Sequence, residues 1–129
     1  MKSKRLIKVK TKKIINSFKY AFEGIVTSFK TERNMKIHVL ATVLVILLGV
    51  ILKINKTEWI LCTFAITIVI SAELFNTALE TIVDMITKEK NVKAKIAKDV
   101  SAGAVLVTAI GATVVGTIIF IPKILQILL

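Results

Sequence analysis

Long apolar runs restrict the fold of this chain more than any other feature. Three of them, covering residues 37–52, 59–83 and 100–121, approach the roughly 20 residues that a helix needs to cross the hydrocarbon core of a bilayer. The basic residues are segregated from these runs, mostly into the first 36 positions and the segment 88–98. The sequence therefore predicts an all-α integral membrane protein with a single domain over residues 1–129.

The composition supports this class. The chain combines 55% hydrophobic residues with a formal net charge of +11, which excludes an ordinary small soluble domain. Basic residues near membrane helices mark the cytoplasmic side. We therefore expect a multi-pass protein of the cell membrane with its N-terminus and the segment 88–98 in the cytoplasm, and no nucleic-acid partner. The single cysteine, Cys62, excludes an internal disulfide and is expected to be a buried apolar filler.

The order of segments follows from the spacing of apolar residues. Residues 1–10 have no apolar period and are expected to form a basic tail that is disordered or rests on anionic headgroups. Residues 11–30 alternate apolar and polar side chains at helical spacing, which predicts an amphipathic helix on the membrane surface. Asn55 or Thr57 offers an N-cap for the second span, and Pro122 marks the end of the third. The membrane helices are predicted at about 34–53, 58–87 and 94–121.

A polar stripe interrupts the second apolar run. On a helix, Glu73, Asn76, Glu80 and Asp84 fall within a sector about 80° wide. Polar groups inside a membrane are costly and usually functional. This stripe is the first candidate for a site.

Other charged residues are expected at the same depth as the stripe. Glu32 precedes the first span, and Lys98 and Asp99 open the third. We expect the acidic residues near the spans to lie on the cytoplasmic side, whereas a pathway for ions would need polar groups through the whole membrane. Carboxylates with phosphate oxygens suit Mg²⁺, a further carboxylate can act as a general base, and Lys98 can neutralise a phosphoryl group. The pattern predicts chemistry at the cytoplasmic face on a membrane-borne substrate.

The stretch from Glu73 to Asp84, ELFNTALETIVD, resembles the signature of the prokaryotic diacylglycerol kinase family. The resemblance extends from about Phe18 to Ile121 and includes Glu32 and the Lys98-Asp99 pair. It implies a small membrane kinase that phosphorylates lipid alcohols with ATP and Mg²⁺. It also implies a homotrimer whose active sites are shared between neighbouring protomers.

The resemblance also implies a role for each matching position. Glu73 would be the catalytic base that takes the proton from the lipid hydroxyl, and Glu32 and Glu80 would bind the metal. Asn76 and Asp84 would support these groups. The ATP-binding positions implied by the resemblance are Tyr20, Glu32, Glu80, Glu89, Lys90, Asn91, Lys98 and Asp99.

Two departures from the family pattern bear on the substrate. His38 stands where the diacylglycerol-specific branch typically has an acid, and it is expected either to contact a headgroup or to be capped at the interface. Ala102, within Ser101-Ala102-Gly103, lacks a hydroxyl that could recognise a second polar group of a glycerolipid. With these two departures, the chain resembles the Gram-positive branch of the family, whose members resemble undecaprenol kinases.

The expected function is therefore ATP-dependent phosphorylation of undecaprenol to undecaprenyl phosphate. The alternative within the same class is a diacylglycerol kinase that makes phosphatidic acid. Two alternatives come from other classes: a small oligomeric transporter of ions or protons, and a structural or regulatory membrane subunit in which the polar stripe serves assembly alone.

Overall fold

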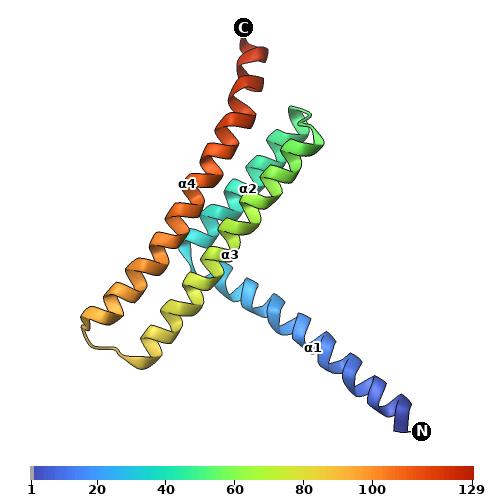
Figure 1. Ribbon diagram of the computed structural model, residues 1–129, viewed down its shortest axis with the longest axis vertical. Helices are drawn as coiled ribbons and strands as arrows, with labels where there is room; N and C mark the ends of the chain where they lie inside the picture. The colour runs from blue at the N-terminus through green and yellow to red at the C-terminus, as the bar shows by residue number, and fades with distance from the viewer. Residues whose placement is uncertain (1) are drawn as a thin grey trace.

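The computed structural model describes residues 2–129, with side chains described from residue 11 onward. It consists of four helices in chain order: α1 (Lys2–Thr31), α2 (Arg33–Ile51), α3 (Lys56–Ile86) and α4 (Val92–Leu128). Helices α2, α3 and α4 form a bundle, and α1 leaves this bundle at an angle (Figure 1). The predicted arrangement, an N-terminal helix followed by three apolar helices, is confirmed.

The outer surface of the bundle is apolar. Helices α2, α3 and α4 are each long and apolar enough to cross a membrane. Large apolar side chains such as Leu40, Phe64 and Ile118 are more than half exposed. Such exposure is unfavourable in water but is expected for a surface that contacts lipid, where only the backbone polar groups must be satisfied internally, as a helix does. This surface identifies a membrane protein.

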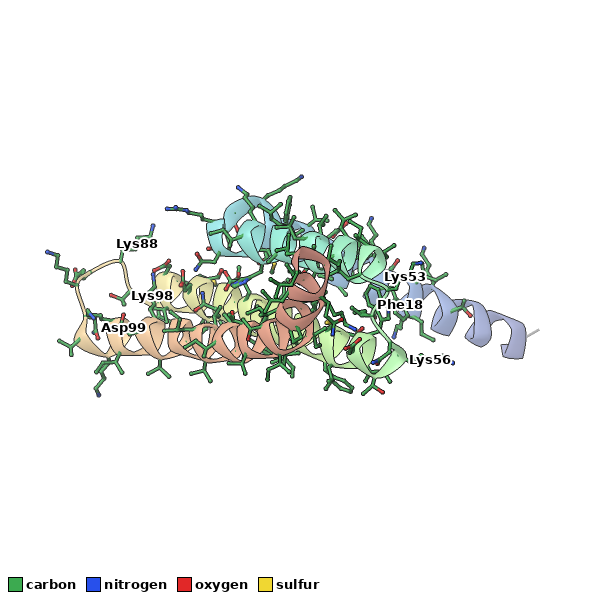
Figure 2. All side chains as sticks on the ribbon, turned by 90° about the horizontal axis from the view of Figure 1, so that it is seen from above. Phe18, Lys53, Lys56, Lys88, Lys98 and Asp99 are labelled. Carbon is green, nitrogen blue, oxygen red and sulfur yellow. The ribbon has the colours of Figure 1, made fainter. Side chains whose placement is uncertain are left out.

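The two ends of the bundle carry different charged residues. Lys88, Lys98 and Asp99 lie at the end where α3 connects to α4, and Lys53 and Lys56 lie at the opposite end, where α2 turns into α3 (Figure 2). Helix α4 packs along much of α3, whereas α2 contacts α3 over a shorter stretch. The α3–α4 pair is therefore the main structural element of the bundle.

A capping box starts α3. The Asn55 side chain accepts a hydrogen bond from the Glu58 backbone N–H at 3.0 Å, and the Asn55 backbone N–H donates to the Glu58 carboxylate at 2.7 Å. Of the two predicted N-caps, Asn55 is the one used. The Glu58 carboxylate also lies 3.2 Å from the Lys123 ammonium group near the end of α4. Acidic residues near the spans were expected only at the opposite end of the bundle, where α3 connects to α4, and Glu58 shows that this expectation is wrong. Its carboxylate caps α3 and pairs with Lys123.

A Schellman motif ends α2. The Ile54 backbone N–H donates to the Gly49 carbonyl at 3.1 Å, and the Lys53 N–H donates to the Val50 carbonyl at 3.3 Å. Lys53 adopts φ 51°, a left-handed conformation that usually selects glycine. A Cβ at Gly49 would lie 2.7 Å from the Trp59 ring, so the glycine permits α2 and α3 to approach closely at this turn.

Two helix boundaries differ from those predicted. Helix α1 begins at Lys2, so the segment expected to be a separate basic tail continues the helix; Met1 lies outside the described residues. Lysine and arginine are good helix formers, and no proline or glycine interrupts the chain before Gly24. Helix α4 continues through Pro122 to Leu128. Proline removes one backbone donor but leaves the remaining ladder intact, which membrane helices tolerate.

Candidate active site

The least exposed side chains of the described chain come from α1, α2 and α3, which contact one another. The largest fully buried side chains are Ser28 of α1, Met35 of α2 and Glu73 of α3. Neither carboxylate oxygen of Glu73 has a hydrogen-bond partner among the described residues. A buried polar group without a partner is costly and usually has a functional reason. The lone pairs of Glu73 are thus free to accept a proton.

Two further carboxylates are close to Glu73. Glu32, at the start of α2, and Glu80, two turns along α3, both interact electrostatically with it. Both are half-buried, and Glu80 accepts a hydrogen bond of 3.1 Å from the Asn76 amide. Three like charges on adjacent elements favour a bound cation or proton. Glu32 and Glu80 are thus near enough to Glu73 to influence its charge, although no three acidic side chains of the described residues lie close enough to hold one metal ion by themselves.

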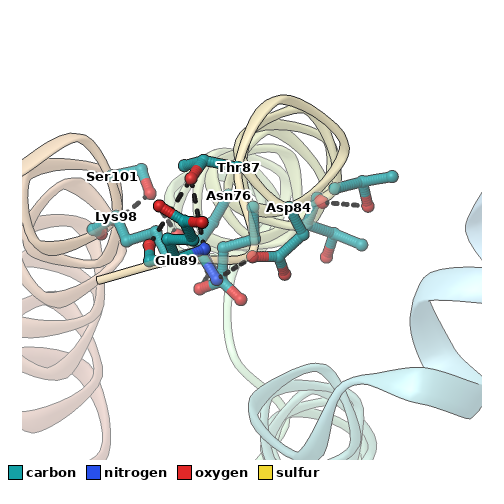
Figure 3. Close-up of polar contacts among 9 residues, drawn as sticks. Asn76, Asp84, Thr87, Glu89, Lys98 and Ser101 are labelled. Carbon is teal, nitrogen blue, oxygen red and sulfur yellow. Dashed lines mark hydrogen bonds and ion pairs between the residues drawn. The ribbon is translucent and has the colours of Figure 1, made fainter. Parts of the chain in front are cut away.

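A hydroxyl from α4 hydrogen-bonds the Asn76 side chain. The Ser101 hydroxyl donates to the Asn76 side-chain oxygen at 2.6 Å, with the Lys98 carbonyl 3.0 Å away as a second acceptor (Figure 3). Since the Asn76 amide nitrogen donates to Glu80, the contacts form a chain from Ser101 through Asn76 to Glu80. A groove of about 760 Å³ between α3 and α4 is lined by Asn76 and Ser101, so this chain lies beside an open space.

An ion pair joins the ends of α3 and α4. The Lys98 ammonium group lies 2.6 Å from the Asp84 carboxylate (Figure 3), and it also interacts electrostatically with Glu80. The Lys98 side chain is 35% exposed. The stripe on α3 therefore extends through Asp84 to a cation on the neighbouring helix.

Four residues predicted to bind ATP lie away from the three carboxylates of the site. Tyr20 is 64% exposed and precedes Ser28 on α1 by about 12 Å of helix. Glu89, Lys90 and Asn91 are exposed in or next to the connection between α3 and α4. The Asn91 side chain caps α4 by accepting from two backbone N–H groups. Their predicted contacts with ATP stay predictions.

The remaining predicted residues have local contacts of their own. Asp99 forms an ion pair with Lys95, one turn earlier on α4. Ala102 is exposed on α4, and half-buried His38 lines a groove between α2, α3 and α4. These positions stay predictions for nucleotide or lipid recognition.

Two hydroxyl residues of the site, Ser28 and Ser101, were not predicted as site residues. Ser28 hydrogen-bonds Thr77 of α3 at 2.9 Å. A weak signal exists for both, since Ser28 is one turn before Glu32 and Ser101 is one turn after Lys98. Periodicity places each serine on the same face as a charged residue, but it does not show the partner on the neighbouring helix.

The fold and the site define a small polytopic membrane protein with a carboxylate cluster and a lysine at one end of its bundle. Residues 19–120 match the family model described as prokaryotic diacylglycerol kinase. The chain belongs to this family and is a membrane lipid kinase.

Similar proteins carry two different names. The chain is 39% identical to undecaprenol kinase of Bacillus subtilis over 86% of its own length and 90% of that protein. It is 37% identical to a diacylglycerol kinase of Synechocystis, over 89% of its length and 66% of that protein. A diacylglycerol kinase of Haemophilus influenzae is 33% identical, with coverage of 73% and 80%. The resemblance noted in the signature is thereby confirmed.

Proposed function

We propose that this kinase transfers the γ-phosphoryl group of ATP to the hydroxyl of a membrane isoprenoid alcohol, at the cytoplasmic face of the cell membrane. The observation that carries the proposal is the Glu73 carboxylate, which is fully buried with both oxygens unpartnered. A general base must offer a free lone pair to the proton that it removes. The basic N-terminal region and the segment 88–98 support a cytoplasmic orientation of this end.

The residues divide the reaction between them. Glu73 accepts the proton of the lipid hydroxyl. The hydroxyl oxygen forms a bond to the γ-phosphorus of ATP while the bond between the γ-phosphorus and the bridging β-phosphate oxygen breaks. Lys98 balances negative charge on the phosphates, and Asp84 holds Lys98 toward α3. Asn76, fixed by Ser101, orients Glu80. Each role requires only a group that the α3–α4 end of the bundle already contains.

The cluster fits Mg²⁺ together with nucleotide. Mg²⁺ is commonly held by one or two carboxylates plus substrate phosphates, and Glu32 and Glu80 would supply these carboxylates. Within the described residues no group of three or more His, Cys, Asp or Glu side chains could hold a metal by itself, so phosphate oxygens of the nucleotide would have to complete the coordination. Bound there, the ion would neutralise phosphate charge. A homotrimer with shared sites, as the sequence resemblance implies, would bring a second copy close to this cluster.

The isoprenoid substrate is supported by two observations. The relative from Bacillus subtilis, matched over nearly its full length, is named undecaprenol kinase. Ala102 also lacks a hydroxyl for a second polar group of a glycerolipid. The relatives named diacylglycerol kinase favour diacylglycerol as the second candidate. Membership of a lipid kinase family gives no support to the transporter or the structural subunit.

The test is a substrate comparison. The purified full chain in lipid nanodiscs receives ATP and Mg²⁺ with either undecaprenol or diacylglycerol, and kcat/KM is measured for each. The proposal predicts the higher kcat/KM for undecaprenol. A clear preference for diacylglycerol would overturn the isoprenoid assignment and leave the kinase chemistry in place.

A further inference from the structure

A long groove separates α2 from the α3–α4 pair. It has a volume of about 480 Å³, within the range of small-molecule sites. Small side chains create the space, among them Ala65 of α3 and Ala112 and Gly116 of α4. On α4 the lining extends from Ala109 to Ile121, which corresponds to about 18 Å of helix. The groove is therefore long enough for an extended hydrocarbon chain. We refer to it as the inter-helix groove.

The polar groups that line the inter-helix groove are largely committed elsewhere. The hydroxyls of Thr42, Thr113 and Thr117 each donate to a carbonyl of their own helix at 2.8 Å. They leave no hydroxyl proton for a ligand. Apart from His38 of α2, whose side chain also lines the groove, the walls offer no free hydroxyl to replace the hydration of a polar solute or an ion. The chemistry of the walls therefore favours a hydrocarbon along most of the groove.

The groove is aligned with the catalytic carboxylate. The α3 residues Cys62, Val69 and Ile70 line it, and Glu73 follows Val69 by four positions and Ile70 by three. Such spacing places all of them on one face of the helix. The same stripe of α3 thus lines the groove in the membrane and carries Glu73 one turn beyond its inner end. A lipid whose hydroxyl reached Glu73 would direct its chain along this groove.

We propose that the inter-helix groove binds the isoprene units next to the hydroxyl of a single-chain isoprenoid alcohol. The inference rests on the proposed function and extends it to the recognition of the chain. One apolar groove matches one chain, whereas diacylglycerol has two. Because the bilayer is as apolar as the groove, the chain gains packing contacts and no hydrophobic free energy on entry. The groove therefore selects chain shape and affects KM more than kcat.

A matched pair of substitutions on α4 tests this role. Gly116 lines the groove and Gly111 does not, and a Cβ added at either meets no atom within 4 Å. We expect Gly116→Leu to raise the KM for undecaprenol by about tenfold, the scale of one or two misplaced methylenes in an apolar pocket. Its kcat, its KM for ATP and its activity on a prenol of one isoprene unit should be unchanged. Gly111→Leu should change none of these quantities.

Several results would overturn the inference. Equal KM changes in both variants would do so, and so would loss of the oligomer in Gly116→Leu with equal loss of activity on all lipids, which would indicate a helix of a second copy in the groove. If wild-type protein phosphorylates diacylglycerol but no isoprenoid alcohol, the proposed function fails first. If it phosphorylates undecaprenol and Gly116→Leu behaves as wild type, only the groove assignment fails.

A second measurement does not depend on the folding of any variant. Wild-type protein in nanodiscs is irradiated with an isoprenoid alcohol that carries a diazirine in its second isoprene unit, and labelled peptides are mapped. We expect labels at groove residues near Glu73, such as Val69 and Ile70. Labels confined to Phe75 and Val100, which line the other groove between α3 and α4, would contradict the assignment.

Discussion

The hydroxyl groups of Ser28 on α1 and Thr77 on α3 lie 2.9 Å apart. The Thr77 hydroxyl donates its proton to the Glu73 carbonyl, also at 2.9 Å, so the Ser28 hydroxyl must be the donor to Thr77. Ser28 is 2% exposed. This buried chain of two hydrogen bonds connects the N-terminal helix to the turn of α3 that carries Glu73.

Loss of the Ser28 hydroxyl should therefore disturb the position of α1 relative to Glu73. We expect Ser28→Ala to lower kcat by about threefold to tenfold, since a buried hydrogen bond contributes about 0.5–1.5 kcal/mol, with little change in the KM for lipid. Ser28→Thr, which keeps the donor, should restore part of the loss. The matched control is Ser17→Ala, because the exposed Ser17 hydroxyl bonds to the Lys13 carbonyl of its own helix. Equal activities of Ser28→Ala and Ser17→Ala would contradict this role.

Lys98 and Asp84 should differ in their effects on activity. Lys98→Ala removes the cation proposed to face the phosphates, so we expect kcat/KM for ATP to fall by about 100-fold. Asp84→Asn removes only a partly exposed partner of that lysine, and the expected loss is at most about fivefold. Steady-state kinetics with varied ATP measures both. Lys95→Ala, which breaks an exposed ion pair on α4, is the control, and a loss as large as that of Lys98→Ala would argue against a specific role for Lys98.

Gly49 should be intolerant of a larger side chain. A Cβ at this position would lie 2.7 Å and 2.9 Å from two atoms of the Trp59 ring. We expect Gly49→Ala to destabilise the protein by about 1–3 kcal/mol, the usual cost of overpacking. Thermal unfolding in detergent measures the change. Gly111→Ala meets no atom within 4 Å and should be neutral or slightly stabilising, and a Gly49→Ala protein as stable as this control would refute the close packing.

A substitution of Lys53, at the same turn, should have the opposite effect and stabilise the protein. Its φ of 51° is unfavourable for a residue with a Cβ by about 1–2 kcal/mol. We expect Lys53→Gly to raise the free energy of unfolding by a large part of that amount, without any change in activity. Lys56→Gly in the first turn of α3 is the control and should be destabilising. A destabilised Lys53→Gly protein would show that the lysine side chain outweighs the backbone strain.

The sequence was sufficient for the parts of the fold that depend on local pattern. Apolar runs located the three membrane helices, and the steps of three and four residues placed Glu73, Asn76, Glu80 and Asp84 on one face. The α3 cap at Asn55 was one of two predicted alternatives. These features depend on residues within one helix, where the period of 3.6 is a reliable guide.

Other contacts depend on how the helices align with one another. The Ser101–Asn76 and Ser28–Thr77 hydrogen bonds join residues that are distant in the sequence. The pattern within one helix shows which residues share a face. It does not show which residues of a second helix lie at the same depth. The continuation of α4 past Pro122 was also missed, because proline usually ends a helix in water, where the backbone has an alternative partner.

The most direct test of the central claim is the activity of Glu73→Gln. The substitution keeps the size of the buried side chain and removes the charge and the basicity. In nanodiscs with ATP, Mg²⁺ and undecaprenol, we expect kcat to fall by about 10²–10⁴-fold, the contribution of a general base, while the protein stays folded. Glu23→Gln, at an exposed carboxylate paired with Lys19 on α1, should retain wild-type kcat. A Glu73→Gln protein that phosphorylates undecaprenol at the wild-type rate would contradict the account.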